Sequence, residues 1–187
     1  MGVEFFPLTA ERWLDFERLL GKAGGTGGCW CMYWRLTNKD YEAHKGEGNR
    51  QIMQALVNRG EVLGIMAYVD GTPAGWCSLA PRERFPRLAT SRVFKQFDEQ
   101  PVWTIVCFFI AKAFRRQKLS AKLLRAAVDY AQQHGAQIVE ACPVEPQYGT
   151  APEVFMWTGI ASTFKQVGFV EVARRSETRP LMRYYVK

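Results

Sequence analysis

The stretch "FFIAKAFRRQKLSAKLLRAAVDYA" occupies residues 108–131 and joins three features of the chain. It contains the end of an apolar run, residues 102–111, which is typical of a strand buried on both faces. Apolar residues at helical spacing then run from residue 119 to residue 131, and Gly135 can end that helix. A short basic turn lies between the two, with Lys112, Arg115, Arg116 and Lys118. The stretch therefore predicts a buried strand, a cationic turn and a long helix.

The cationic turn has the properties of an anion site. The first N–H groups of a helix have no partner within it, and the helix dipole favours negative charge there. Ser120 and Ala121 are small enough to let a phosphate approach the backbone, and Arg115, Arg116 and Lys118 would add charge-assisted hydrogen bonds. Cations at a helix start are unfavourable unless an anion joins them. The turn thus predicts a pyrophosphate site, and a solvated basic face stays open as the alternative.

Two other phosphate-binding patterns fit less well. A P-loop and a dinucleotide-binding fingerprint both need glycines that this turn lacks. The net charge of +7 suits a nucleic-acid partner, but the chain contains no helix-turn-helix, RRM or zinc-finger spacing. We expect nucleic acid to be an unlikely partner.

The remaining patterns predict an α/β order of β-α-α-β-β-β-α-β-α-β-β. Residues 3–8 are predicted to form the first strand, and helices are predicted at residues 10–20 and 49–60. A hairpin is predicted to turn at Asp70 and Gly71. Residues 137–144 are a second buried strand. A short helix ending at Gly168 and two final strands complete the chain.

These elements resemble the GNAT superfamily of acyl-CoA N-acyltransferases. Its main motif is an apolar strand followed by Gln/Arg-x-x-Gly-x-Gly/Ala and a helix. Arg115 takes the first position here, whereas Lys118 and Ser120 stand at the glycine positions. The stretches "DGTPAGWCSL", "IVEACPVEP" and "GIASTFKQVGF" resemble the family's hairpin, fifth strand and closing helix. The resemblance implies one domain over residues 1–187, with a mixed central sheet of six or seven strands, a splayed parallel strand pair, and helices on both faces.

The resemblance also implies acetyl-CoA as co-substrate and transfer of its acetyl group to a primary amine of a small molecule or peptide. The amine would attack the thioester directly in a ternary complex, and a backbone N–H near Phe108 or Phe109 would stabilise the oxyanion. A CoA-binding protein of the same fold without turnover is the alternative. The implied cofactor residues are Phe108, Phe109, Ile110, Arg115, Arg116, Gln117, Lys118, Leu119, Ser120, Ala121 and Lys122.

Proton transfer is where the chain departs from the family. The family often uses a Tyr on its last helix to protonate the departing thiolate, and Phe164 stands at that position. Tyr148, in the preceding loop, is the candidate replacement. Glu140, on the fifth strand, is the candidate base, although a lone Glu in a strand is more often structural.

The segment "GGCWCMYWR" resembles an N-terminal feature of a bacterial subgroup of GNAT-like proteins. We expect Trp30, Cys31, Tyr33 and Trp34 either to cap the acceptor end of the cleft or to fill a core. Cys-x-Cys is too tight for common zinc spacing, so no metal is predicted. A reactive thiol stays open, because Arg35 would lower the pKa of a nearby thiol.

The chain has 187 residues and five cysteines, and no apolar run reaches the length of a membrane span. Its start does not resemble a signal peptide. We therefore expect a cytoplasmic protein with reduced thiols and no membrane partner. The sequence leaves a homodimer open.

Overall fold

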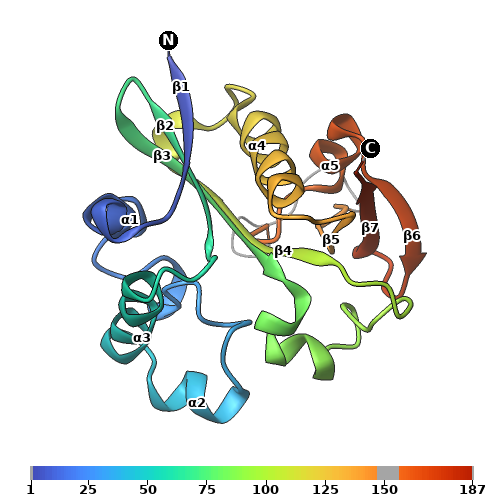
Figure 1. Ribbon diagram of the computed structural model, residues 1–187, viewed down its shortest axis with the longest axis horizontal. Helices are drawn as coiled ribbons and strands as arrows, with labels where there is room; N and C mark the ends of the chain where they lie inside the picture. Colours follow the sequence, from blue (N-terminus) through green and yellow to red (C-terminus); the bar gives the residue numbers. More distant parts are fainter. Residues whose placement is uncertain (1, 147–155, 187) are drawn as a thin grey trace.

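The fold is built around one mixed β-sheet, in a computed structural model that describes residues 2–146 and 156–186. The seven strands stand in the order β1-β2-β3-β4-β5-β7-β6 (Figure 1). The β4–β5 pair is parallel, and the other neighbouring pairs are antiparallel. The prediction of a mixed sheet with a parallel pair is therefore confirmed.

The helices and strands follow the predicted order, with one addition. The strands are β1 Val3–Pro7, β2 Gly64–Val69, β3 Thr72–Pro81, β4 Trp103–Ile110, β5 Ile138–Ala141, β6 Val170–Arg174 and β7 Pro180–Tyr185. The helices are α1 Trp13–Leu20, α2 Asn38–Ala43, α3 Glu47–Asn58, α4 Leu119–Gln133 and α5 Ala161–Val167. The sequence did not predict α2, a helix of 6 residues. Across the described residues no helix combines the length and apolarity that a membrane crossing requires.

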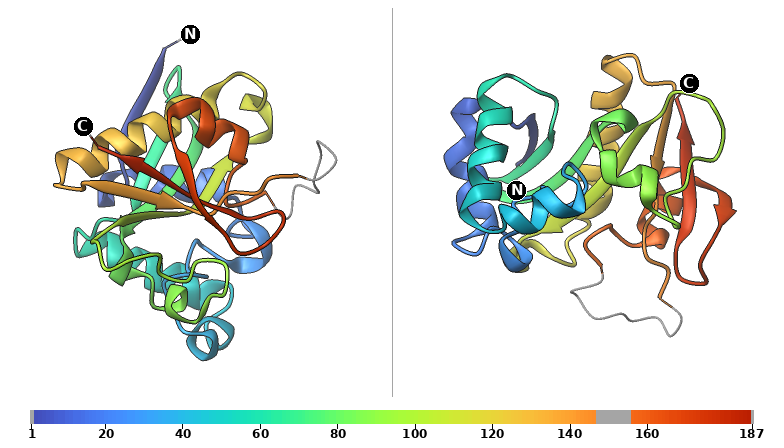
Figure 2. Two further views of the ribbon diagram at one scale, coloured as in Figure 1. Left: turned by 90° about the vertical axis from the view of Figure 1, so that its right-hand side faces the viewer. Right: turned by 90° about the horizontal axis from the view of Figure 1, so that it is seen from below.

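Both faces of the sheet are covered by helices (Figures 1 and 2). Successive strand residues point to opposite faces, and β2 shows the result. Ile65, Ala67 and Val69 pack with α4 and α5, whereas Met66 and Tyr68 pack with α1 and α3. All six residues of β2 are buried in consequence. The six apolar residues of α4 that the sequence placed on one stripe are all buried in the first of these cores.

A buried ion-pair network is centred on Glu140 of β5. The Glu140 carboxylate, 1% exposed, accepts from Arg183 Nε at 2.9 Å and from Arg82 Nη1 at 3.0 Å. Arg183 also donates two hydrogen bonds to Asp98, at 2.7 and 3.0 Å, and these hold the pKa of that carboxyl at about 2. Because a bidentate guanidinium–carboxylate pair is directional, the network ties the segment before β4 to β5 and β7.

Candidate active site

The parallel strands β4 and β5 separate part-way along their length. They pair at only three positions, from Trp103 opposite Val139 to Ile105 opposite Ala141. On the other edge of β4, Ile105 faces Leu79 and Cys107 faces Ser78, so Val106 is an extra residue, a β-bulge. The bulge bends β4 where its pairing with β5 stops. The strands therefore splay as the family resemblance implied.

The open edge of β4 carries backbone groups that a ligand can use. Ala111 N–H donates to Ala74 of β3, and alternate residues of a strand point to opposite edges. The backbone N–H and C=O groups of Phe108 and Ile110 consequently point into the gap between β4 and β5. Phe108 N–H donates to the Trp157 carbonyl at 2.6 Å. The segment from residue 156 to 160 thus lies across the splay, held at its other side by a 2.8 Å bond from Val144 N–H to the Gly159 carbonyl.

The cationic turn follows the open end of β4. Arg115 Nε donates to the Ile110 carbonyl at 3.0 Å, which anchors the turn to the strand. Arg116 and Lys118 both have positive φ, 62° and 60°. Glycine accepts that conformation readily and other residues rarely do. Lys118 occupies a glycine position of the family motif, so the glycine-type backbone is retained although the glycine is absent.

The start of α4 presents backbone donors and cationic side chains together. Lys118 is the N-cap residue and makes no side-chain cap hydrogen bond. The side chain of Leu119 is in the core, so only its backbone is available to a ligand. Arg116, Gln117, Lys118 and Lys122 are exposed, whereas Ser120 and Ala121 are half-buried. Gln117 Nε2 donates to the Ala113 carbonyl at 3.0 Å, within the turn. The arrangement suits an anion that binds several N–H groups at once.

A cavity of about 310 Å³ opens beside the splay. Its floor is β4, through Cys107, Phe108 and Phe109, and Trp157 lies along its rim. The end of α1, the segment between α1 and α2, α2 itself and β3 form the rest of its wall: Leu20, Gly24, Gly25, Thr26, Cys29, Cys31, Tyr33, Tyr41 and Trp76. Aromatic and apolar groups dominate this surface, as in many small-molecule pockets.

Three thiols, those of Cys29, Cys31 and Cys107, line the cavity. Trp76 Nε1 donates to Cys31 Sγ at 3.1 Å. A hydrogen bond from the Cys107 thiol, helped by Trp76 and by the charge of Arg35, lowers the pKa of Cys31 to about 7 despite its burial. The same hydrogen bond, followed by burial, raises the pKa of Cys107 well above its usual value. Burial and the charge of Cys31 also raise the pKa of Cys29.

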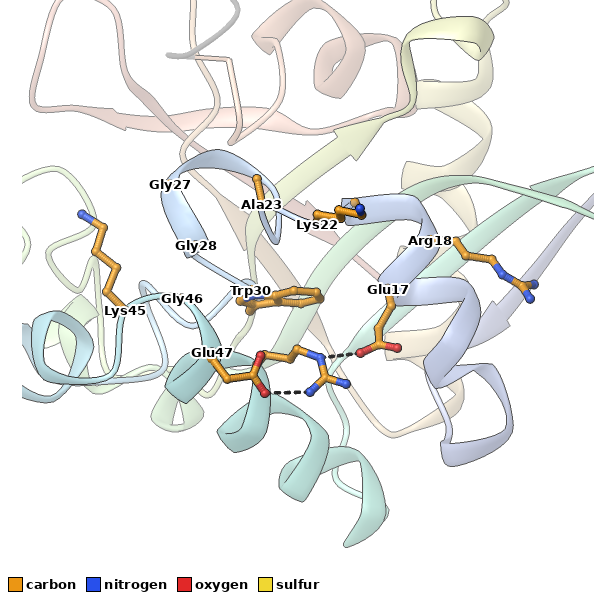
Figure 3. Close-up of a pocket in the computed structure, with 12 residues that line it drawn as sticks. Glu17, Arg18, Lys22, Ala23, Gly27, Gly28, Trp30, Lys45, Gly46 and Glu47 are labelled. Carbon is orange, nitrogen blue, oxygen red and sulfur yellow. Dashed lines mark hydrogen bonds and ion pairs between the residues drawn. The ribbon is translucent and has the colours of Figure 1, made fainter.

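The structure separates the four aromatic-segment residues that the sequence grouped as substrate-binding. Cys31 and Tyr33 line the cavity. Trp34 is buried behind it, stacked on Trp157 with ring centroids 5.9 Å apart. Trp30 lines a separate open groove of about 900 Å³, where Figure 3 shows its ring beside Glu17 of α1 and Glu47 of α3. These two tryptophans pack in cores, which was the alternative that the sequence left open.

The structure does not place the predicted base, Glu140, in the cavity lining. Both oxygens of Glu140 are held by arginines away from the cavity lining, so its carboxylate is positioned as a structural ion-pair partner. Tyr148 lies outside the described residues. Phe164 is buried in the core beneath α5. No described lining residue of the cavity is an Asp, Glu, His or Lys.

Sequence reasoning missed Tyr41, Trp76, Cys107 and Trp157 as cavity residues. Strand alternation would have found one of them, because Cys107 shares a face of β4 with Phe109. Trp76 of β3 lies opposite Phe109 in the register between β3 and β4. Within residues 2–146 and 156–186, no group of three or more His, Cys, Asp and Glu residues could hold a metal ion.

Comparisons with known proteins agree with this geometry. A family model described as the acetyltransferase (GNAT) family matches residues 30–152. No curated protein sequence matches the chain. Solved structures match over the whole fold. PaiA N-acetyltransferase from Thermoplasma acidophilum, in complex with coenzyme A, is 12% identical with a TM-score of 0.56, and both chains are covered in full.

Two further structures have the same fold. An acetyltransferase of the GNAT family from Streptococcus pneumoniae is 12% identical with a TM-score of 0.59, again over 100% of both chains. Mosquito arylalkylamine N-acetyltransferase like 5b is 8% identical with a TM-score of 0.59, over 99% of this chain and 100% of that one. At such identities the structures establish the fold, while the family model covers well over half of the chain. The chain belongs to the GNAT family of acetyltransferases, enzymes that use acetyl-CoA as the acyl donor.

Proposed function

We propose that this chain, as a single domain over residues 1–187, transfers the acetyl group of acetyl-CoA to a primary amine of a small molecule or peptide. The amine attacks the thioester directly while both substrates are bound. One observation carries the proposal: β4 and β5 separate after Ile105, beside a cavity, and the cationic start of α4 follows the same end of β4.

In this proposal the cofactor lies along β4. The diphosphate binds the N–H groups of Leu119, Ser120 and Ala121, with Arg116 and Lys118 as counter-charges. The pantetheine arm runs along the open edge at Phe108 and Ile110. Arg115 and Gln117 position the turn, Lys122 of α4 adds charge, and Phe109 forms the cavity floor.

The thioester carbonyl takes the Phe108 N–H in place of the Trp157 carbonyl. That donor then stabilises the oxyanion of the tetrahedral intermediate. The amine enters from the aromatic cavity, with Tyr33 and Cys31 on its wall. Holding amine and thioester in line supplies much of the acceleration. Tyr148 stays our sequence-based prediction for the proton donor to the CoA thiolate. The five free thiols support a reducing compartment, and we place the protein in the cytoplasm.

Release of free CoA thiol from acetyl-CoA tests this function. We expect continuous release, many equivalents per protein, with at least one member of a panel of primary amines that includes aryl-alkyl amines and peptide N-termini. Steady release with no amine would instead indicate hydrolysis. Tight CoA binding without release for any amine would favour a CoA-binding protein without turnover.

A further inference from the structure

Three thiols meet in the cavity beside the proposed thioester position. Cys29 and Cys31 come from the segment before α2, and Cys107 comes from β4. The Cys107 thiol, which lines the same cavity, does most to lower the pKa of Cys31, and the Trp76 indole N–H donates a hydrogen bond to the Cys31 sulfur at 3.1 Å. Donors that converge on a sulfur stabilise its anion more than its thiol. The surroundings of Cys31 are therefore those of a thiolate.

A buried cation next to Cys31 leads to the same conclusion. Arg35 is 9% exposed and donates from Nη2 to the Leu63 carbonyl at 2.9 Å. Its Nε has no hydrogen-bond partner, and no carboxylate of the described chain forms an ion pair with it. A buried guanidinium needs a compensating negative charge. Burial lowers the pKa of Arg35 to about 10, and the Cys31 sulfur followed by the Glu61 carboxylate supplies the attraction that opposes this effect.

The backbone holds Cys31 in place. Trp30 and Cys31 are consecutive non-glycine residues with positive φ, 46° and 61°. This conformation is costly for both side chains, and such residues persist only where their surroundings over-determine them. Trp30 is fixed by stacking on Trp13, with ring centroids 6.3 Å apart. The neighbouring Cys31 sulfur is consequently fixed within the cavity.

Cys31 lies beside the proposed position of the thioester, where a thiolate could act as a nucleophile. Its partner Cys107 immediately precedes Phe108, whose N–H is the proposed oxyanion donor, and all three residues line one cavity of about 310 Å³. Among the described lining residues the ionisable groups are three cysteines and two tyrosines. Cys107, Cys29 and Tyr41 have raised pKa values, and Cys31 has a pKa of about 7. A thiolate is the nucleophilic form of cysteine.

We propose that Cys31 is an acyl-accepting site, which takes the acetyl group of acetyl-CoA when no amine occupies the cavity. The inference rests on the cofactor position proposed above. The Cys31 thiolate attacks the thioester carbonyl carbon and forms a new carbon–sulfur bond. The bond from that carbon to the CoA sulfur breaks, and its electron pair leaves with CoA as a thiolate, which solvent protonates. One thioester replaces another, so the exchange is reversible by added CoA and needs no oxidant or reductant.

Mass spectrometry of the intact chain tests the proposal. The protein is incubated with acetyl-CoA and no amine, then quenched in acid. We expect one added acetyl group per chain, mapped to Cys31 by peptide analysis, and release of one equivalent of CoA thiol. Neutral hydroxylamine should remove it, because it cleaves a thioester and leaves a lysine amide intact. Excess CoA should remove it as well.

Matched variants separate the site from its neighbours. Cys31→Ser should lose the modification completely, whereas Cys29→Ser should keep it. Cys107→Ala should slow acetylation by about tenfold, since it removes one hydrogen bond to a charged sulfur. Calorimetric binding of CoA by Cys31→Ser at wild-type affinity shows that this variant is folded with its cofactor site intact.

The outcomes distinguish this inference from the proposed function. A wild-type protein that binds acetyl-CoA but carries no hydroxylamine-sensitive acetyl group overturns the Cys31 site, as does acetyl found on Cys29 or Cys107. Continuous thiol release with amines would still support the acetyltransferase reaction in that case. Absence of acetyl-CoA binding would overturn both.

Discussion

Substitution Arg116→Glu is expected to weaken acetyl-CoA binding by about 100-fold or more. Charge-assisted hydrogen bonds to a phosphate contribute about 1.5–3 kcal/mol each, and a carboxylate adds repulsion where an attraction is lost. Arg116 is exposed at the turn before α4, so its replacement should leave the core unchanged. Its positive φ is no obstacle, because glutamate is no more strained there than arginine.

Isothermal titration of wild type and variant with CoA measures this effect. Arg92→Glu is the matched control, with the same change of charge at an exposed residue of the segment before β4. The control should bind CoA as the wild type does. Wild-type affinity in Arg116→Glu, or an equal loss in both variants, would show that the diphosphate does not use this turn.

The second large effect is expected at Glu140. Replacing it by Gln should lower the free energy of unfolding by about 3 kcal/mol, because buried Arg183 and half-buried Arg82 each lose their ionic partner on β5. The exposed pair of Glu171 with Arg174 gives the comparison, and Glu171→Gln should cost less than about 1 kcal/mol. Urea unfolding of the two variants, monitored by circular dichroism, gives both values.

The same variant separates the structural role of Glu140 from the catalytic role that its sequence position suggested. Thiol release by folded Glu140→Gln, measured well below its unfolding midpoint, should match that of the wild type. A variant as stable as the wild type but inactive would instead make Glu140 the base.

The fold was readable from the sequence wherever a local pattern set the structure. The apolar run of β4 and the stripe of α4 predicted a buried strand and a covering helix, and both formed. The turn at Asp70 and Gly71 has positive φ at both residues, as a tight hairpin requires. Helix α2 was not predicted, because Tyr41 is its only buried residue and the sequence therefore shows no apolar stripe there.

The site was less readable because its parts come from distant segments. The sequence could name Glu140 only as a candidate base or a structural residue, because its partners Arg183 and Arg82 lie 43 and 58 residues away in the chain. Cys31 and Cys107 meet only after the segment before α2 folds over β4. The sequence left open whether the aromatic segment caps the cleft or fills a core. Which of its residues line the cavity depends on the backbone turn at Trp30 and Cys31. Sequence spacing does not reveal that turn, since neither residue is a glycine.

A crystal structure of the protein with coenzyme A tests the central claim most directly. We predict that the diphosphate lies against the N–H groups of Leu119, Ser120 and Ala121, and that the pantetheine arm follows the edge of β4 at Phe108 with the Trp157 carbonyl displaced. Coenzyme A bound elsewhere, with Phe108 still bonded to Trp157 and the start of α4 empty, would contradict the account.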